Sequence, residues 1–150
     1  LNKKDKITKE LLLKWHKEIF GETKGDMGGR FRDYFVRVGV YLAPDWQEIE
    51  KLISELIDFI EKNQKMNPVE MAARAHYKFE KIHPFGDGNG RIGRLLMNYI
   101  LWHRSCPMLI IEYKKRRSYY KALQKDEDRF VSYFIRRYLA VHKKRINLFA

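Results

Sequence analysis

The 150-residue sequence lacks a second cysteine and any long apolar run. Because Cys106 is the only cysteine, an internal disulfide is excluded, and we expect the chain to work in a reducing compartment, the cytoplasm. No stretch approaches the roughly 18 consecutive apolar residues of a membrane-spanning helix, and no secretory signal pattern is present. The sequence is therefore unlike a disulfide-rich secreted module, and we expect no membrane partner.

Acidic residues are also scarce relative to basic ones. Lys and Arg number 31 against 19 for Asp and Glu, which gives a formal net charge of +12. Residues 113–150 hold twelve of the basic residues and three of the acidic ones, so an excess of nine charges lies in the last quarter. This excess favours contact with nucleic acid or another polyanion. A nucleic-acid-binding module that uses the basic C-terminal helices is therefore one open function class, although helical spacing assigns the interleaved aromatic residues to a core.

Apolar residues make up 45% of the chain, which is enough for one domain with a real core over residues 1–150. Their spacing of three and four residues predicts a mainly α fold, with Thr8 capping the first helix and Pro68 starting the third. The buried faces of the second and fourth helices are predicted to include Trp46 and His103. The helices are expected around 11–19, after Pro44 and Asp45 as far as 60, at about 69–82, after the break at 84–88 as far as 103, and at about 116–125 and 128–145.

One segment has a different period. Val36, Val38 and Val40 alternate with other residues, and aromatic side chains surround them within 31–42. Alternation of this kind is typical of a strand. We therefore expect one short hairpin or extended flap in an otherwise helical fold.

The segment His83-Pro-Phe-Gly-Asp-Gly-Asn-Gly-Arg-Ile-Gly-Arg94 carries the chemistry. Its glycines permit a tight turn with close backbone approach, and the free N–H groups of the following helix form an anion site. Arg91 and Arg94 lie three residues apart in the first turn, so both project from one face. Cations there oppose the helix dipole, and bound phosphates would reverse that cost.

Two further side chains of the segment complete a phosphoryl-transfer site. Asp87 would repel phosphates unless a divalent cation bridges them, and one carboxylate with phosphate oxygens is a usual Mg²⁺ site. His83 lies at the edge of the same turn and can be a neutral base near pH 7. Each residue alone has a structural explanation, such as an Asx-turn for Asp87, but the conjunction within twelve residues favours function.

Residues 83–94 resemble the complete Fic motif, H-P-F-x-[D/E]-G-N-G-R-x-x-R, at every fixed position. Similarity to the family extends over about residues 7–140. It implies a helical Fic fold with a hairpin flap and a nucleotidyltransferase activity. Most members transfer AMP from ATP to a Ser, Thr or Tyr hydroxyl of a target protein and release pyrophosphate.

The resemblance also implies roles for single residues. His83 would be the general base, Asp87 would bind Mg²⁺, and Asn89 would contact the α-phosphate. Arg91 and Arg94 would hold the β- and γ-phosphates. The remaining motif positions divide into an anion nest, made by Gly88, Asn89 and Gly90, and a shaped loop, made by Pro84 and a core-packed Phe85.

Two segments outside the motif receive roles by the same resemblance. The flap residues Val38, Gly39, Val40 and Tyr41 would cover the nucleotide, and the flap 36–42 would pair with the backbone of the target. Tyr119 would line the adenosine pocket. His16, His76, His103 and His142 match no functional position and are predicted to be structural or exposed.

One element of many Fic proteins is missing from this sequence. Their inhibitory helix carries [S/T]-x-x-x-E-[G/N], and its Glu pairs with the second motif Arg. No Ser or Thr of this chain has Glu four residues later. We therefore expect residues 1–150 to be a catalytic core, with any inhibitory helix supplied by another segment or another chain.

A few Fic proteins transfer UMP, phosphocholine or phosphate in place of AMP. The intact pair of Asn89 and Gly90 argues against the subgroup that transfers phosphate. Transfer of another nucleotide such as UMP stays open beside transfer of AMP.

Overall fold

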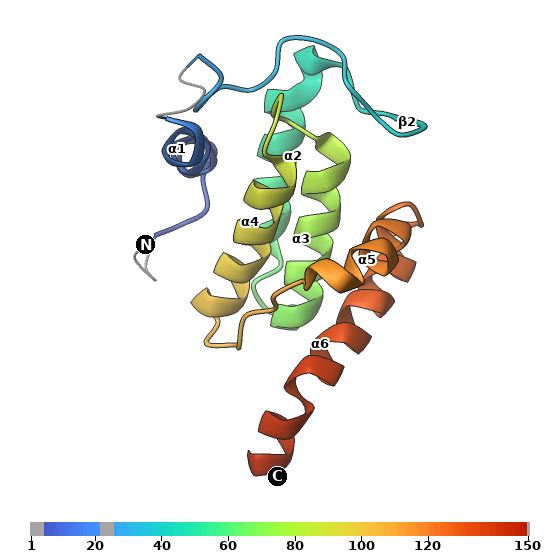
Figure 1. The fold of residues 1–150 in the computed structure, drawn as a ribbon. Helices are drawn as coiled ribbons and strands as arrows, with labels where there is room; N and C mark the ends of the chain where they lie inside the picture. The colour runs from blue at the N-terminus through green and yellow to red at the C-terminus, as the bar shows by residue number, and fades with distance from the viewer. Residues whose placement is uncertain (1–4, 22–25, 150) are drawn as a thin grey trace.

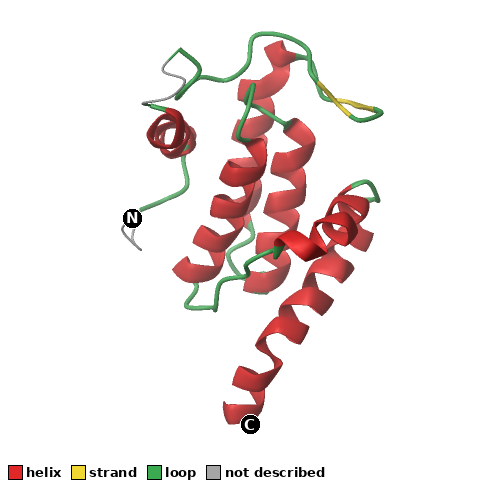
Figure 2. Cartoon of the chain, viewed as in Figure 1, coloured by secondary structure: helices red, strands yellow, loops and turns green. Residues whose placement is uncertain are grey.

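The computed structural model describes residues 5–21 and 26–149, with side chains described as far as Lys143. These residues form six α-helices, two 3₁₀ turns and one two-stranded hairpin, which confirms the expected mainly α fold with one small β element (Figures 1 and 2). The elements in chain order are α1 (Lys9–Phe20), β1 (Arg37–Val38), β2 (Tyr41–Leu42), η1 (Trp46–Glu48), α2 (Ile49–Lys62), α3 (Pro68–Ile82), α4 (Asn89–His103), η2 (Tyr113–Lys115), α5 (Arg116–Leu123) and α6 (Glu127–Phe149).

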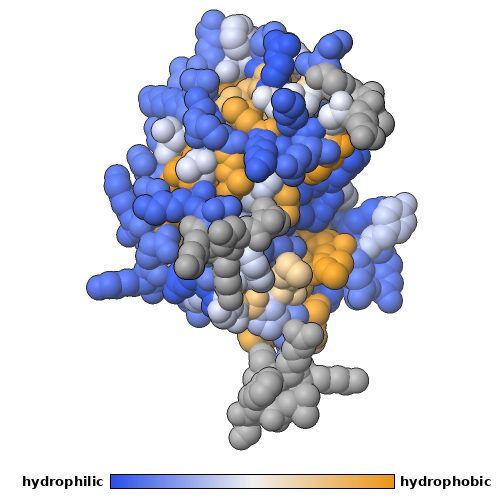
Figure 3. All heavy atoms as spheres, turned by 90° about the vertical axis from the view of Figure 1, so that its left-hand side faces the viewer, coloured by the Kyte–Doolittle hydropathy of each residue, from blue (hydrophilic) through white to orange (hydrophobic). Residues whose placement is uncertain are grey.

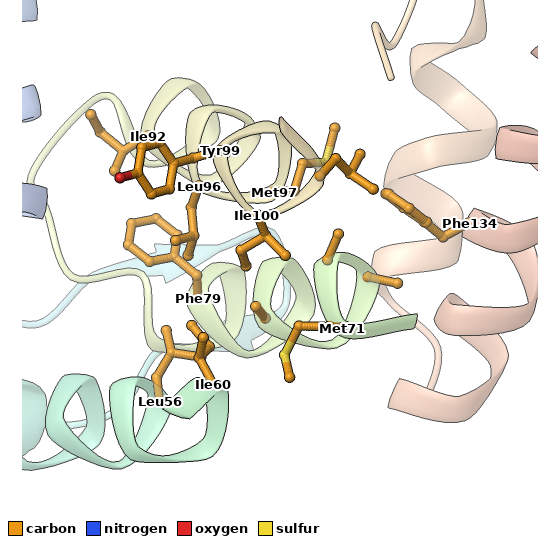
Figure 4. Close-up of a cluster of buried hydrophobic side chains, with 14 of the residues drawn as sticks. Leu56, Ile60, Met71, Phe79, Ile92, Leu96, Met97, Tyr99, Ile100 and Phe134 are labelled. Carbon is orange, nitrogen blue, oxygen red and sulfur yellow. The ribbon is translucent and has the colours of Figure 1, made fainter. Parts of the chain in front are cut away.

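Helices α3 and α4 form the centre of the fold. They lie side by side, joined by a short turn, while α2 and α6 pack against α3 (Figure 1). Their shared core contains side chains from four helices, with Phe79 at its middle (Figure 4). Burial of so many large apolar side chains is the main force that holds the helices together. The turn between α3 and α4 is therefore carried on the most deeply packed pair of the molecule.

The helix starts follow from local sequence. The Thr8 hydroxyl accepts a hydrogen bond from the Leu11 N–H at 3.1 Å, and Pro68 occupies the first turn of α3. Asn67 caps α3 by accepting from the Val69 N–H at 2.9 Å. Such caps satisfy amides that have no partner within the helix. The predicted roles of Thr8 and Pro68 are confirmed.

Two predicted core positions are wrong. Trp46 lies in the 3₁₀ turn before α2 and is 36% exposed, because Asp45 caps that turn and the α-helix begins only at Ile49. His103 is exposed, because it ends α4 beyond the last buried turn. Each of the two residues continues the apolar spacing of its helix by one step, beyond the turns that pack against the core.

The hairpin is shorter than the period of the valines suggests. Arg37 pairs with Leu42 and Val38 with Tyr41, so the turn falls at Gly39 and Val40. Gly39 has φ +62°, a backbone conformation that residues with a side chain rarely adopt. Val40 is 95% exposed at the tip rather than on one strand face. The predicted hairpin is confirmed, and the alternating valines extend past strand β1 into its flank and the turn.

Hydrophilic side chains cover most of the face of the molecule over α1, and apolar side chains show between them (Figure 3). Among residues 5–21 and 26–149, no helix has both the length and the apolar character needed to span a bilayer.

One carboxyl group is buried where α3 crosses α4. Oε1 of Glu80 is inaccessible to solvent, has no hydrogen-bond partner among the described residues, and lies where a side chain at Gly93 would collide with it. Burial raises the pKa of Glu80 to about 8, while the charge of Arg94 acts in the opposite direction. Near neutral pH the folded protein therefore holds Glu80 in its protonated form.

This burial makes the stability of the protein depend on pH. The unfolded chain ionises Glu80 near its ordinary pKa of about 4.5, and the folded chain near 8. The contribution of Glu80 is thus most favourable below pH 4.5 and is lost as the pH rises toward 8, at about 1.4 kcal/mol per pH unit.

The variant Glu80→Gln should be more stable than the unaltered chain at neutral pH, because the amide keeps the shape of the acid and cannot ionise. We expect its advantage in unfolding free energy to grow by about 1 kcal/mol per pH unit from pH 5 to 8. Denaturant unfolding at several pH values measures it, with the exposed Glu55→Gln as the control. A difference that does not change with pH would contradict the account.

Candidate functional site

The predicted motif residues surround one open cavity of about 280 Å³ at the end of α3 and the start of α4. Its walls come from the turn, from the first two turns of α4 and from α5, and they are His83, Gly86, Asp87, Gly88, Asn89, Gly90, Arg91, Arg94 and Tyr120. A larger cavity, of about 380 Å³, lies at the far end of α4 beside Tyr99 and contains none of these residues. The charged and titratable side chains of the motif, rather than the size of the cavity, identify the candidate site.

His83 ends α3 in a left-handed conformation, with φ 51° and ψ 60°. This conformation is uncommon for a residue with a side chain, so surrounding contacts must hold it. Its N–H donates to the Phe79 carbonyl at 3.0 Å, and its carbonyl accepts from Nε of Arg32 at 2.7 Å. Burial and then the charge of Arg32 lower the pKa of His83. The imidazole is therefore neutral and basic near pH 7, as a general base must be.

The turn after His83 is closed by Asn89. Oδ1 of Asn89 accepts from the Phe85 N–H, and Nδ2 donates to the Phe85 carbonyl, both at 2.8 Å. Phe85 is fully buried, as predicted. Asn89 is 3% exposed and its side chain is engaged by the turn, although the residue also lines the cavity. A second hydrogen on Nδ2 remains for a ligand, so contact with a phosphate stays a prediction.

His16 on α1 supports the turn from below. Its ring stacks on Phe85 with centroids 3.8 Å apart, and its two nitrogens meet the backbones of two loops. Nδ1 accepts from the Gly29 N–H at 3.0 Å, which leaves Nε2–H to donate to the Asp87 carbonyl at 2.9 Å. Burial lowers the pKa of His16, in keeping with this neutral form. The prediction of a structural His16 is confirmed, whereas the sequence does not indicate its contacts with Phe85 and Asp87 of the motif turn.

The start of α4 combines a helix N-terminus with two arginines. Gly88 precedes the helix with φ +83°, and the Phe20 ring occupies the space that a side chain would need. The first turn contains no acidic residue and has no side-chain cap. Arg91 lies over the Phe20 ring at 5.2 Å, and Arg94 folds back toward Gly90. Both cations line the cavity with the helix N-terminus, which confirms that they share one face.

Asp87 is exposed at the rim of the cavity. Its Oδ1 accepts from the Gly88 N–H at 2.8 Å, which is the local turn that the sequence allowed. No group of three or more His, Cys, Asp or Glu that could hold a metal occurs among the described residues. A single exposed carboxylate nevertheless fits Mg²⁺ that is held together with a bound phosphate, because this ion takes most of its ligands from phosphates and water.

The two adjacent tyrosines of α5 point to different places. Tyr119 is 2% exposed, and its hydroxyl donates to Nε2 of His76, whose Nδ1–H donates to the Gly93 carbonyl at 2.8 Å. Burial lowers the pKa of His76 to about 4, so this fully buried pair is neutral. The residue that lines the cavity is Tyr120. Tyr119 is absent from the walls of this cavity, because one position turns a helix by about 100°, and its contact with adenosine stays a prediction.

The hairpin lies outside the cavity lining. Val38, Gly39, Val40 and Tyr41 are absent from its walls. The Tyr41 hydroxyl donates instead to the Lys81 carbonyl at 2.7 Å, which ties β2 to the last turn of α3. The structure thus brings the motif together and holds the hairpin nearby, while a contact of residues 38–41 with nucleotide stays a prediction.

The basic C-terminal helices form a second charged feature. A groove of about 390 Å³ between α5 and α6 is lined by Lys121, Lys125, Arg129 and Arg136, among others. Phe130 and Phe134 are buried in the core, as their spacing predicted. They are therefore not platforms on which nucleic-acid bases could stack.

Comparison with known proteins gives a consistent result. The Fic/DOC family profile matches residues 6–101. Proteins named protein adenylyltransferase Fic from Culex quinquefasciatus and Aedes aegypti are 39% and 37% identical, each over 91% of this chain. A protein of the same name from Nematostella vectensis is 34% identical over 91% of the chain. The chain spans 28%, 28% and 32% of the length of these relatives, respectively.

Solved structures show the same relationship. Fic-1 of C. elegans superposes with a TM-score of 0.84 and 29% identity, covering 96% of this chain and 44% of that one. A Fic domain protein of Bacteroides thetaiotaomicron has a TM-score of 0.78 and 26% identity, covering 93% of this chain and 64% of the other. With the motif at every fixed position, the family profile over most of the chain and this likeness in fold, the chain belongs to the Fic/DOC family.

Proposed function

We propose that the chain transfers AMP from ATP to a hydroxyl group of a target protein and releases pyrophosphate. The observation that carries the proposal is one cavity whose walls include a neutral histidine, a helix N-terminus and two arginines. The names of the relatives, protein adenylyltransferase Fic, support the same reaction. A base opposite a site for several phosphates suits attack on a nucleotide phosphorus.

The chemistry follows from the placement of the charges. The target hydroxyl loses its proton to a ring nitrogen of His83 as its oxygen bonds to the α-phosphorus of ATP. The bond between the α-phosphorus and the bridging oxygen breaks, and pyrophosphate leaves with the electron pair. Arg91, Arg94 and the N-terminus of α4 stabilise the charge on the leaving group. The turn supplies position and charge, which is most of what phosphoryl transfer requires.

Asp87 is the residue that would hold Mg²⁺ at the rim. The ion would neutralise phosphate charge and offset the repulsion between Asp87 and the nucleotide. In the apo protein the carboxylate already has a fixed direction, because Oδ1 is held by the Gly88 N–H.

Two further contacts complete the proposal. Tyr120 is in place to contact the adenosine, because it is the aromatic residue in the cavity lining, and the resemblance assigns the same contact to its neighbour Tyr119. The hairpin presents exposed apolar side chains at Val38, Val40 and Leu42 next to the end of α3. An extended target segment could add to its edge as a further strand and carry a hydroxyl toward His83.

The proposed reaction is tested by intact mass after incubation with Mg²⁺ and each of the four nucleoside triphosphates in turn. We expect a gain of one AMP on the chain itself or on a protein of an added cell lysate, with ATP only. A gain of UMP would show that UTP is the donor and that the type of transfer reaction is the one proposed. Binding of ATP without any transfer to either acceptor would contradict the proposal.

Replacing the base should separate binding from transfer. In His83→Ala the rate of AMP transfer should fall by about 10² to 10⁴, the usual contribution of a general base. The affinity for ATP should change by less than about threefold, because the phosphate ligands lie in α4. Quantitative labelling and calorimetry measure the two effects, with the exposed His103→Ala as the control. Transfer at the unaltered rate would show that His83 is not the base.

Replacing the carboxylate should remove the effect of Mg²⁺. Asp87→Asn keeps an acceptor for the Gly88 N–H and loses the charge. We expect ATP to bind the variant at least as well without Mg²⁺, and the gain on adding Mg²⁺ to shrink by about tenfold, or about 1.4 kcal/mol. Titrations with Mg²⁺ and with a chelator measure this, with the exposed Asp58→Asn as the control. An unchanged Mg²⁺ gain would exclude Asp87 as the ligand.

A further inference from the structure

Arg32 is a buried cation bound only by backbone carbonyls. It is 4% exposed, although its side chain carries a full charge. Its Nε donates to His83 O at 2.7 Å and its Nη1 to Tyr34 O at 2.9 Å. Its Nη2 donates to Pro44 O at 2.7 Å and to Ile82 O at 3.2 Å. A planar guanidinium can reach four acceptors in this way, whereas a lysine ammonium cannot reproduce the fork.

No carboxylate forms an ion pair with Arg32 among residues 5–21 and 26–149. The positive charge lies instead at the C-terminal end of α3, where the last carbonyls of the helix carry partial negative charge. Burying a charge without a counterion is costly unless every donor is satisfied. The four bonds engage four of the five guanidinium N–H groups, which offsets much of that cost, and the fork that they require specifies arginine.

The four carbonyls belong to segments far apart in the chain. Tyr34 precedes the hairpin and Pro44 follows it, while Ile82 and His83 end α3. The backbone of Arg32 strengthens the same junction, because its N–H donates to the Pro84 carbonyl at 2.9 Å. One side chain thus joins both legs of the hairpin to the residue proposed as the base.

We propose that Arg32 is a positioning residue for the transfer reaction, which holds the hairpin and the backbone of His83 in one fixed arrangement. The proposal rests on the function proposed above, in which the hairpin receives the target and His83 takes its proton. The main chain at the base of the hairpin is closed by a single bond, from the Ala43 N–H to the Val36 carbonyl at 3.1 Å. The orientation of this small unit toward His83 therefore depends on the guanidinium and on the Tyr41 hydroxyl.

The charge of Arg32 has a second effect on the same base. A cation near an imidazole disfavours its protonated form, and Arg32 acts on His83 in this direction. The other charged or titratable groups around His83 are Glu80 on its own helix and Asp87, Arg91, Arg94 and Tyr120 across the cavity. All of these remain when Arg32 is replaced, so a change in the titration of His83 would report the loss of this one charge.

Two substitutions separate the fork from the charge. Arg32→Lys keeps a cation and loses the fork, whereas Arg32→Met loses both. The matched control is Arg104→Met, because Arg104 donates to the Gln64 carbonyl at 2.8 Å at the far end of α4. Retention of a cooperative thermal transition identifies the variants that fold, and Arg32→Lys carries the test if Arg32→Met does not fold.

Two readouts need no transfer activity. Amide hydrogen exchange of residues 36–43 should accelerate by about tenfold or more in both variants, while that of the buried turns of α4 is unchanged. The His83 ring, followed by NMR and assigned with His83→Ala, should titrate about half a pH unit or more higher in Arg32→Met. In Arg32→Lys it should titrate close to the unaltered protein. Unchanged exchange in either folded variant, or unchanged titration in a folded Arg32→Met, would overturn the proposal.

A third readout connects the backbone contacts of the Arg32 side chain, here called the clamp, to the reaction. In both variants the affinity for a non-hydrolysable ATP analogue should stay within about threefold, because the ligands for phosphate lie beyond the clamp. AMP incorporation into the acceptor that the unaltered chain labels should fall by about tenfold or more. A parallel loss of nucleotide binding and transfer would show a general structural role and overturn the proposal. If the unaltered chain labels nothing, the proposed function fails, while exchange and titration still decide whether the clamp exists.

Discussion

The site depends on a turn that is closed by one side chain. Between α3 and α4 the chain must reverse direction while its amides point into a cavity, and Asn89 makes this possible by bonding both the N–H and the carbonyl of Phe85. Phe85 is in turn held in the core against the ring of His16. With the turn fixed in this way, His83 and the N-terminus of α4 line the same cavity. Packing far below the surface therefore sets the position of each group that could meet a nucleotide.

The charges of the site are unevenly distributed, with cations at the start of α4 and neutral histidines beside the turn. Cations occupy the start of α4, where acidic residues would stabilise the helix, so the apo protein bears a cost that a polyphosphate would offset. Burial is the main cause that lowers the pKa of both histidines beside the turn, His16 and His83. His16 is buried and accepts from an amide, whereas His83 is partly buried and lies near the cation of Arg32. A neutral base beside a strongly positive pocket is the combination that proton removal during attack on ATP requires.

Short-range features of the sequence predicted much of this structure. The spacing of apolar residues gave the six helices, and the twelve-residue motif gave every member of the cavity lining except Tyr120. Features that depend on contacts distant in sequence could not be read in this way. Arg32 and His16 stand 51 and 71 positions from the motif residues that they bind. Tyr119 and Tyr120 are equivalent in a linear pattern, and only the rotation of α5 against His76 decides which one faces the cavity. The sequence signals for His16 and Arg32 were weak ones: a histidine on the apolar face of α1 and an arginine before a predicted hairpin.

The central claim is that this cavity positions ATP so that the bond beyond its α-phosphorus breaks. The most direct measurement compares protein labelling by ATP that carries the isotope at the α- or at the γ-phosphorus, in the presence of Mg²⁺. The account predicts protein-bound label from the α position only, with the γ label recovered in pyrophosphate. Label retained on protein from the γ position would mean phosphate transfer, and would contradict the orientation of the triphosphate that the arginines and the N-terminus of α4 imply.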